Sequence, residues 1–253
     1  EAKSILKSGY QEITLLGQNV NSYKTPEGDF PVLLDKLGKI KAIKRIRYTS
    51  PHPRDIDEEL LKVMVKHDNI CNQIHLPLQA GSSRILKRMN RTYTKEEFLN
   101  LVDMIRTYIP DCGLSTDIIV GFPGETEEEF QETLEVVSKV KFDTAFMFKY
   151  SARPGTKASH YTDHISEDVK QSRLQTLIEF QHNISLMNNR KRIGLNLDVV
   201  IEKESKKSAN QWAGRIESNT WVIFDKKDGY QIGDMVNLNI IDARGISLFG
   251  KIN

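Results

Sequence analysis

The stretch Asp117-Ile118-Ile119-Val120-Gly121-Phe122-Pro123-Gly124-Glu125-Thr126 decides the fold, because a β-branched run ends in a Gly-Pro turn. The acidic residues 127–129 follow directly, and apolar residues then recur at helical spacing up to Val140. The run is typical of a buried strand, and Thr126 before three acidic residues is typical of a helix N-terminus. The stretch therefore predicts the strand-to-helix half of a βα unit.

Four more runs of the same kind surround it, mostly at about the 30-residue interval of a βα unit. They are residues 12–16, 45–49, 73–76 and 145–148. Amphipathic helices are expected between them, and Thr94 with Glu97 predicts a capping box at the start of one. Strands joined by crossover helices are parallel, so residues 1–160 predict an α/β fold, a partial TIM-like barrel with about five parallel strands.

The sequence changes character after residue 160. A long helix is expected from about Ser166 to Arg192, with Gly194 as its C-cap. Five short alternating segments follow, at 197–201, 211–215, 221–224, 235–241 and 247–250. Short strands separated by Gly-containing turns indicate a small all-β, OB-like barrel. We therefore expect two domains, 1–193 and 194–253.

Composition limits the class of protein. Hydrophobic residues make up 39% of the chain, mean hydropathy is −0.45, and the formal net charge is +2. No apolar run approaches 18 residues, so no membrane contact is expected. Cys71 and Cys112 have no metal-ligand spacing and are expected to be inert core thiols of a cytoplasmic protein. Residues 1–6 resemble the middle of a helix, so we expect the chain to begin inside a longer protein.

Basic residues are unevenly distributed. Residues 36–47 and 84–95 are two Lys/Arg-rich segments, and Arg190-Lys191-Arg192 is a third at the expected domain junction. Each could bind a phosphate backbone, and for the first two a solvated helix face is an equally good interpretation. The junction segment is the better phosphate candidate.

Each expected barrel strand is followed by a polar or Gly-rich segment, at 17–19, 49–53, 77–82, 121–126 and 149–156. Individually, each has a structural explanation: 121–124 as a tight turn, His52 as a rigid corner between prolines, His75 as a hydrogen-bonded core histidine. Ligands of parallel sheets bind beyond the carboxyl ends of the strands. Five such segments together therefore predict a binding site at that edge.

Four of these strings, 12–23, 75–82, 117–126 and 150–156, resemble the radical S-adenosylmethionine (SAM) methylthiotransferases. Segments 214–215, 222–224 and 247–250 resemble the RNA-binding TRAM domain of that family. The resemblance covers essentially the whole chain. It implies a radical SAM barrel over 1–193, a TRAM domain over 194–253, and an enzyme that uses SAM and two 4Fe-4S clusters.

Residues 15–23 and 75–82 most resemble the branch of the family that acts on tRNA. This branch adds a methylthio group to C2 of N6-isopentenyladenosine beside the anticodon. One SAM supplies the methyl group and a second yields the radical that takes hydrogen from C2. The alternatives are the threonylcarbamoyl-adenosine branch, the ribosomal-protein branch, and a non-catalytic RNA-binding module in which Trp212, Trp221 and Tyr230 stack on bases or pack in a core.

The resemblance also implies roles for individual residues. The SAM amino-acid end is expected at Gln18 and Asn19, and its ribose and carboxylate at Gln79 and Ser82, because neutral amides and hydroxyls orient a zwitterion without adding charge. The backbone from Ile119 to Phe122 is expected to meet the adenine, with Gly121 allowing close approach. The remaining candidates are Arg153 and Ser50, as catalytic residues near the clusters or the target nucleotide, and Arg190, Lys191, Arg192 and Arg215, as RNA contacts.

One departure from the family pattern is decisive. Each cluster requires three cysteines, and the chain has two cysteines in total, in no cluster motif. No metal ligand is therefore assigned, the cluster-binding part is expected upstream, and the chain alone is expected to be inactive. The expected partners are the anticodon arm of tRNA, SAM, and an electron donor such as flavodoxin or ferredoxin. The protein is expected to be a monomer.

Overall fold

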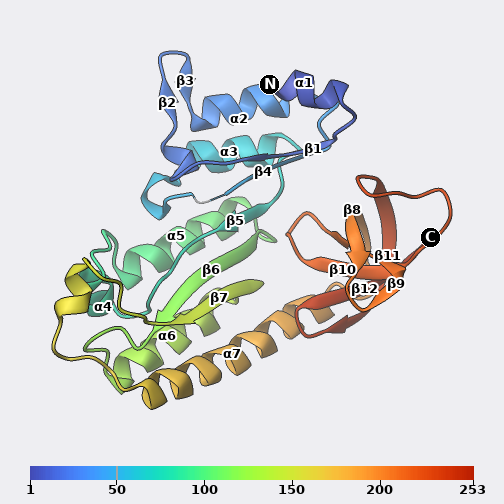
Figure 1. The fold of residues 1–253 in the computed structure, drawn as a ribbon. Helices are drawn as coiled ribbons and strands as arrows, with labels where there is room; N and C mark the ends of the chain where they lie inside the picture. The colour runs from blue at the N-terminus through green and yellow to red at the C-terminus, as the bar shows by residue number, and fades with distance from the viewer. Residues whose placement is uncertain (50) are drawn as a thin grey trace.

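The computed structural model describes residues 1–49 and 51–253, and its first half holds two parallel sheets that together form an open partial barrel (Figure 1). β1 (Glu12–Leu15) pairs with β4 (Arg45–Tyr48), and β5 (Gln73–His75) pairs with β6 (Gly113–Val120), which pairs with β7 (Thr144–Lys149), all in parallel. A parallel bridge between Ile46 and Ile70 joins the two parts. The five expected strands are therefore present as a two-stranded sheet, β1-β4, and a three-stranded sheet, β5-β6-β7, which this bridge links into a partial barrel.

Helices connect the strands as the sequence predicts. The main ones are α2 (Phe30–Gly38), α3 (Glu58–Lys66), α5 (Lys95–Tyr108) and α6 (Glu127–Val140), preceded by the short α1 (Ala2–Lys7). Capping boxes begin both α5, at Thr94, and α6, at Thr126, so both predicted N-termini are confirmed. Two short features have no apolar periodicity and were not predicted: α4 (Ser83–Arg88), and the hairpin of β2 (Lys24–Thr25) and β3 (Gly28–Asp29).

β6 shows how the sheet divides its side chains between two faces. Leu114, Ile118 and Val120 are buried in the main core beneath the helices, whereas Asp117 and Ile119 alternate with them and are half-buried on the other face. This second face is the inner face of the partial barrel. β6 begins four residues earlier than the predicted 117–120 run.

The chain then runs along α7 (Glu167–Arg190) into a closed five-stranded barrel. Its strand order is β10-β12-β11-β8-β9, and Val199, Ile201, Val222 and other apolar residues fill it. The strands are β8 (Asn196–Ser205), β9 (Ser208–Arg215), β10 (Trp221–Asp225), β11 (Met235–Arg244) and β12 (Ser247–Ile252). The predicted small β-barrel is confirmed.

The three aromatic residues of this barrel have different environments. Trp212 and Tyr230 pack against the barrel core, as expected for two of the three. Trp221 lies between two cations, with Lys203 Nζ 4.1 Å and the Arg215 guanidinium carbon 4.2 Å from its ring centre. Trp221 therefore lies on the charged outer surface of the barrel.

The small barrel docks against the amino ends of the parallel strands. Arg45 Nη1 and Nη2 donate to the carbonyl oxygens of Arg215 and Asp198 at 2.7 and 2.6 Å. Arg47 donates to the carbonyls of Ile216 and Glu217 at 2.9 and 2.8 Å. Both arginines are buried between the domains, so the hypothesis that they face a phosphate backbone is wrong.

Three other strands are held at the same edge. The Asn72 N–H, just before β5, donates to Glu217 Oε1 at 2.6 Å. Arg192 pairs with Asp143, just before β7, at 2.7 Å. A Cβ on Gly113, the first residue of β6, would lie 2.7 Å from Ser218 Cβ. The small barrel therefore covers the edge opposite to the predicted SAM rim.

Candidate cofactor and RNA sites

The third and fourth strand ends meet directly at the carboxyl edge of the sheet. The Gln79 N–H donates to the carbonyl of Asp117, and the Gln79 carbonyl accepts from the Ile119 N–H, both at 2.8 Å. Gln79 has a left-handed φ of 67° and is only 7% exposed. Two predicted SAM residues, Gln79 and Ile119, are therefore in direct backbone contact, although 40 positions separate them in the printed sequence.

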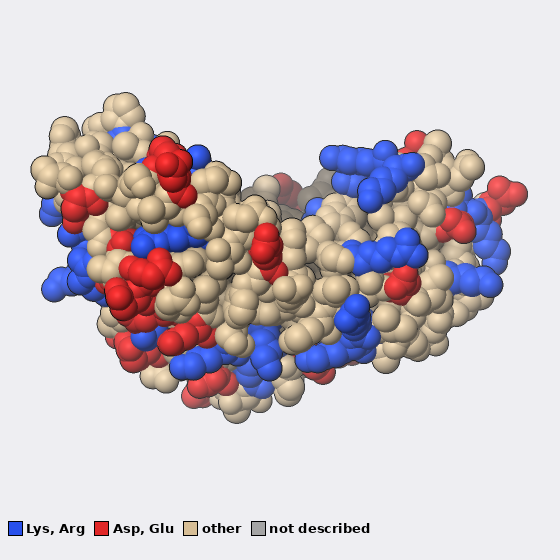
Figure 2. Space-filling view, turned by 90° about the horizontal axis from the view of Figure 1, so that it is seen from below, with Lys and Arg blue, Asp and Glu red and all other residues tan. Residues whose placement is uncertain are grey.

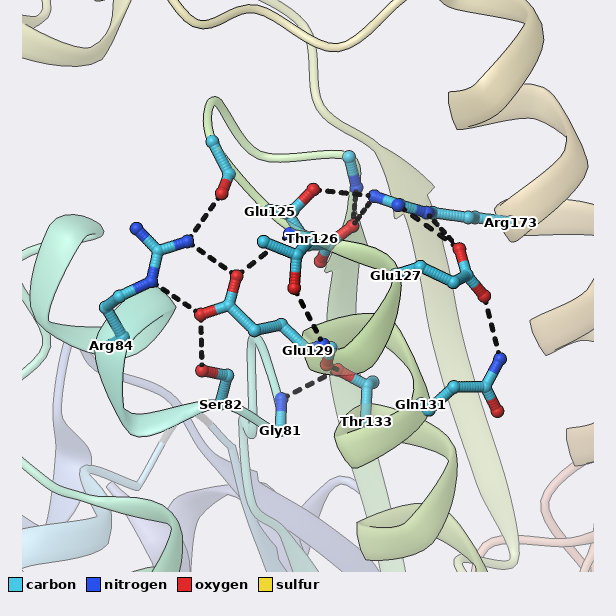
Figure 3. A network of polar contacts seen from close by, with 12 residues as sticks. Gly81, Ser82, Arg84, Glu125, Thr126, Glu127, Glu129, Gln131, Thr133 and Arg173 are labelled. Atoms are coloured by element: carbon cyan, nitrogen blue, oxygen red, sulfur yellow. Dashed lines mark hydrogen bonds and ion pairs between the residues drawn. The ribbon is translucent and has the colours of Figure 1, made fainter.

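Ser82 belongs to a buried polar network (Figure 3). Its hydroxyl donates to Glu129 Oε1 at 3.0 Å, and Arg84 binds both oxygens of the same carboxylate at 2.7 and 2.6 Å. Burial raises the pKa of Glu129, but the hydrogen bonds from Arg84, the Thr126 N–H and Ser82 outweigh burial and lower it. The Ser82 hydroxyl proton is committed to Glu129, so a SAM partner would have to donate to its oxygen.

A second carboxylate anchors the Gly-Phe-Pro-Gly turn (Figure 3). Glu125 accepts from the Gly121 N–H at 2.7 Å and from Arg173 of α7 at 2.8 Å. Burial raises the pKa of Glu125 despite these partners. Glu125 therefore pairs with Arg173, whereas the side chain of Arg153 is exposed.

Gly121 is required by packing as well as by conformation. Its φ is +70°, and a Cβ there would lie 2.4 Å from Lys170 Cγ of α7. The next residue, Phe122, is buried against Tyr150 with ring centroids 5.1 Å apart. The buried Tyr150 hydroxyl finds no hydrogen-bond partner among the described residues. An unsatisfied hydroxyl beside the predicted adenine strand is consistent with a polar ligand at this edge.

The first strand end is more open. Gln18 and Asn19 are exposed, and Asn19 adopts a left-handed φ of 53° at the start of a short 3-10 turn. Arg153 is also exposed, and its carbonyl accepts from Thr156. Ser50 lies outside the described residues. The SAM and catalytic assignments of these four residues remain predictions.

Iron–sulfur clusters do not fit this chain. Burial raises the pKa of Cys71 to about 11 and that of Cys112 to about 12, so both thiols stay protonated at neutral pH. Among the described residues, no three His, Cys, Asp or Glu side chains lie together as a metal site would require. The predicted SAM residues of the rim, in contrast, are neutral amides, hydroxyls and backbone groups that suit SAM.

Sequence reasoning missed a polar cluster on the inner face. His75 Nδ1 and Nε2 lie 3.0 and 3.2 Å from Ser115 Oγ and Asp117 Oδ2. Gln73 donates to the same Ser115 hydroxyl at 3.3 Å. The expected hydrogen bonding of His75 is confirmed, but its side chain faces inward at 20% exposure. Burial alternates along 113–120, but residue type does not: 115–117 are polar in succession and 118–120 apolar, so the face is revealed by burial and strand register.

The predicted RNA residues lie at or near the domain junction but differ in exposure. Arg190 and Lys191 are exposed at the end of α7, whereas Arg192 is half-buried in its ion pair with Asp143. Arg215 lies on the small barrel against Trp221 and donates to Asn219. Lys191 and Arg192 also line a cavity of about 800 Å³ between the domains, where Lys and Arg outnumber Asp and Glu.

The outer shape agrees with two lobes. Figure 2 shows a hollow between them, with Lys and Arg side chains gathered on the right-hand lobe, which holds the β8–β12 barrel. This cavity lies at the amino edge of the sheet, not at the predicted SAM rim. We attribute it to the junction between the domains, because both domains supply its walls.

A parallel βα sheet with a polar carboxyl edge, joined to a small β-barrel, defines a barrel enzyme fold with an appended binding domain. Residues 1–137 match the radical SAM superfamily and residues 190–252 match the TRAM domain. The chain belongs to the radical SAM superfamily. No helix in the described part of the chain is long and apolar enough to cross a membrane.

Similar proteins agree with this assignment. A tRNA-2-methylthio-N(6)-dimethylallyladenosine synthase of Parabacteroides distasonis is 47% identical over 99% of the chain, and one of Thermoanaerobacter sp. is 46% identical over 100%. The chain spans 56% and 54% of those relatives. The solved coproporphyrinogen III oxidase of Escherichia coli, a radical SAM enzyme, matches 82% of the chain and 54% of its own length at 16% identity and a TM-score of 0.51, which supports the fold alone.

Proposed function

We propose that the chain is part of a tRNA methylthiotransferase of the MiaB type. The full-length protein would add a methylthio group to C2 of N6-isopentenyladenosine, also called N6-dimethylallyladenosine, beside the anticodon. The observation that carries this proposal is sequence identity of 43–47% over 99–100% of the chain to relatives that all bear this activity in their names. The radical SAM and TRAM matches occur in the corresponding order.

SAM would bind at the carboxyl edge, where it supplies both the methyl group and the radical chemistry. Gln79 and Ile119 support this placement, because their backbones are locked together there. The Tyr150 hydroxyl, which is buried and has no hydrogen-bond partner among the described residues, is an additional candidate donor. The chain's own work is to orient SAM and the nucleotide and to exclude water, while the cluster ligands would come from other parts of the full-length protein.

The RNA would contact the TRAM domain and the junction. Lys191 at the basic cavity is suited to phosphates. A base could stack on Trp221 if it displaced Lys203 or Arg215, whose cations lie 4.1 and 4.2 Å from the centre of the ring. β6 has eight residues, about 26 Å at the usual rise per residue, so RNA held at the amino edge must extend along the inner face to reach SAM.

The Gly194 N–H donates to the carbonyl of Ile240 in the small barrel at 2.7 Å, which supports a domain boundary at 193/194.

The decisive experiment measures modified nucleosides. The full-length protein, reconstituted without oxygen with iron and sulfide, is given SAM, reductant and an anticodon arm carrying N6-dimethylallyladenosine. Mass spectrometry should detect the 2-methylthio nucleoside. An enzyme that instead modifies threonylcarbamoyl-adenosine, or a ribosomal protein, would overturn the proposal in favour of another branch of the family. Residues 1–253 alone should give no product.

Residue roles are tested by binding. Gln79→Ala in the full-length protein should weaken SAM binding, whereas Gln11→Ala, an exposed glutamine just before β1, should not. Arg190→Ala with Lys191→Ala should weaken tRNA binding and reduce its salt dependence, with Lys3→Ala on α1 as the matched control. The electron donor, the monomeric state and the cytoplasmic location remain predictions.

The non-catalytic alternative makes the opposite prediction. An RNA-binding module would bind tRNA equally well whether or not residues of the SAM rim were altered. It would also give no methylthio product with any supplied reductant, even in the full-length protein.

A further inference from the structure

The inner face of the partial barrel carries an exposed aromatic pair. Phe146 and Phe148 are 53% and 54% exposed, although both lie within β7. Their neighbours Ala145 and Met147 point the other way and pack against the main core. Strand alternation therefore places both phenyl rings on the inner face.

The pair lies beside the polar cluster of that face. Phe146 is the register partner of Asp117, and Phe148 that of Ile119. The ring of His75, which contacts Asp117, meets the Phe146 ring edge to face, with centroids 6.1 Å apart and an interplanar angle of 65°. The surface therefore combines two apolar rings with a hydrogen-bonding edge.

This surface is continuous with the carboxyl edge where SAM is expected. Gln79 bonds the backbone on either side of Ile118, through Asp117 and Ile119. Those two residues are the register partners of Phe146 and Phe148. A nucleotide whose base must meet SAM would consequently lie across this face.

We propose that Phe146 and Phe148 recognise the apolar N6 substituent of the target adenosine. The polar atoms of the purine would meet the His75–Asp117 edge, while a branched five-carbon group would cover the two rings. An apolar substituent on a base explains why two large aromatics stay uncovered next to a polar pair. The inference rests on the proposed function, because that function supplies such a nucleotide.

The test compares two RNA ligands on the full-length reconstituted protein with SAM present. Anticodon arms carrying N6-dimethylallyladenosine and N6-methyladenosine compete for the protein, and the ratio of their Kd values is measured. The native protein should prefer the dimethylallyl arm by at least about tenfold, as expected for several extra carbons in an apolar site. Phe146→Ala with Phe148→Ala should reduce the ratio to near unity and leave the Kd of the methyl arm unchanged.

Two controls separate recognition from folding. Phe146→Leu with Phe148→Leu keeps an apolar surface and should retain most of the preference. Val65→Ala removes an apolar side chain of similar exposure, 54%, from the outer helix α3 and should leave the ratio unchanged.

Three results would overturn the inference. The native protein could show no preference for the dimethylallyl arm. The Phe→Ala pair could retain the native preference. The Phe→Ala pair could also bind both arms more weakly by the same factor, because another part of the full-length protein covers the face. Formation of the methylthio nucleoside by the native protein is an independent measurement. If the native protein forms this nucleoside and the Phe→Ala pair has the same Kd ratio as the native protein, only the inference is refuted. If the native protein does not form it, the proposed function is refuted together with the inference.

Discussion

Arg47 should be a main attachment between the two domains. Its side chain is 8% exposed, and its guanidinium donates to the Ile216 and Glu217 carbonyls of the TRAM domain and pairs with Glu12 Oε1 at 3.0 Å. Removal of one partner from a buried ion pair costs about 3–5 kcal/mol. Arg45 Nη1 stays 3.9 Å from Glu12 Oε2 and limits the loss, so we expect about 3 kcal/mol for Arg47→Ala.

The assay is thermal unfolding of residues 1–253, followed by circular dichroism. For a chain of this size, about 3 kcal/mol corresponds to a fall in Tm of roughly 6–12 °C. Arg47→Lys should fall between the native chain and Arg47→Ala, because an ammonium keeps the charge but not the planar fork. Arg244→Ala, which removes a 73% exposed arginine from the TRAM surface, should leave Tm nearly unchanged. Equal Tm values for Arg47→Ala and Arg244→Ala would refute the docking argument.

Other features give sharp expectations. At pH 8 a thiol with a pKa of about 11 is about 0.1% thiolate, so Cys71 and Cys112 should resist iodoacetamide until the chain is unfolded; mass spectrometry that finds rapid native labelling would contradict this. Gly81→Ala should lower Tm strongly, because its Cβ would lie 2.3 Å from a backbone Cα of α6, whereas Gly17→Ala meets nothing closer than 3.5 Å and should not. Glu129→Gln should be less stable than the native chain at pH 7. Since the folded pKa of Glu129 is lowered, the difference should shrink as pH falls below its unfolded value of 4.5, and a constant difference in urea denaturation would argue against this.

The secondary structure of the chain could largely be predicted from its sequence. The five barrel strands, the capping boxes at Thr94 and Thr126 and the five-stranded second domain are all confirmed, because strand alternation and helix capping depend on residues close in sequence. The short helix α4 was not predicted, because its six residues are too few to show a helical period.

The candidate site was only partly predictable. The strand-end segments identify the carboxyl edge, and the contact between Gln79 and Ile119 agrees with it. The inner face, with His75, Asp117 and Phe146, follows from register between strands, which no single segment specifies.

The sequence by itself determined the order of the elements, the polar carboxyl edge and the family resemblance, since each is written in contiguous stretches. Tertiary structure alone decided where the TRAM domain docks and which basic residues are free. In the sequence, Arg45 and Arg47 resemble part of a basic surface. Their carbonyl acceptors, however, lie 153 to 170 positions later in the chain. A buried charge is stable only where distant carbonyls and carboxylates converge on it, and folding brings them together.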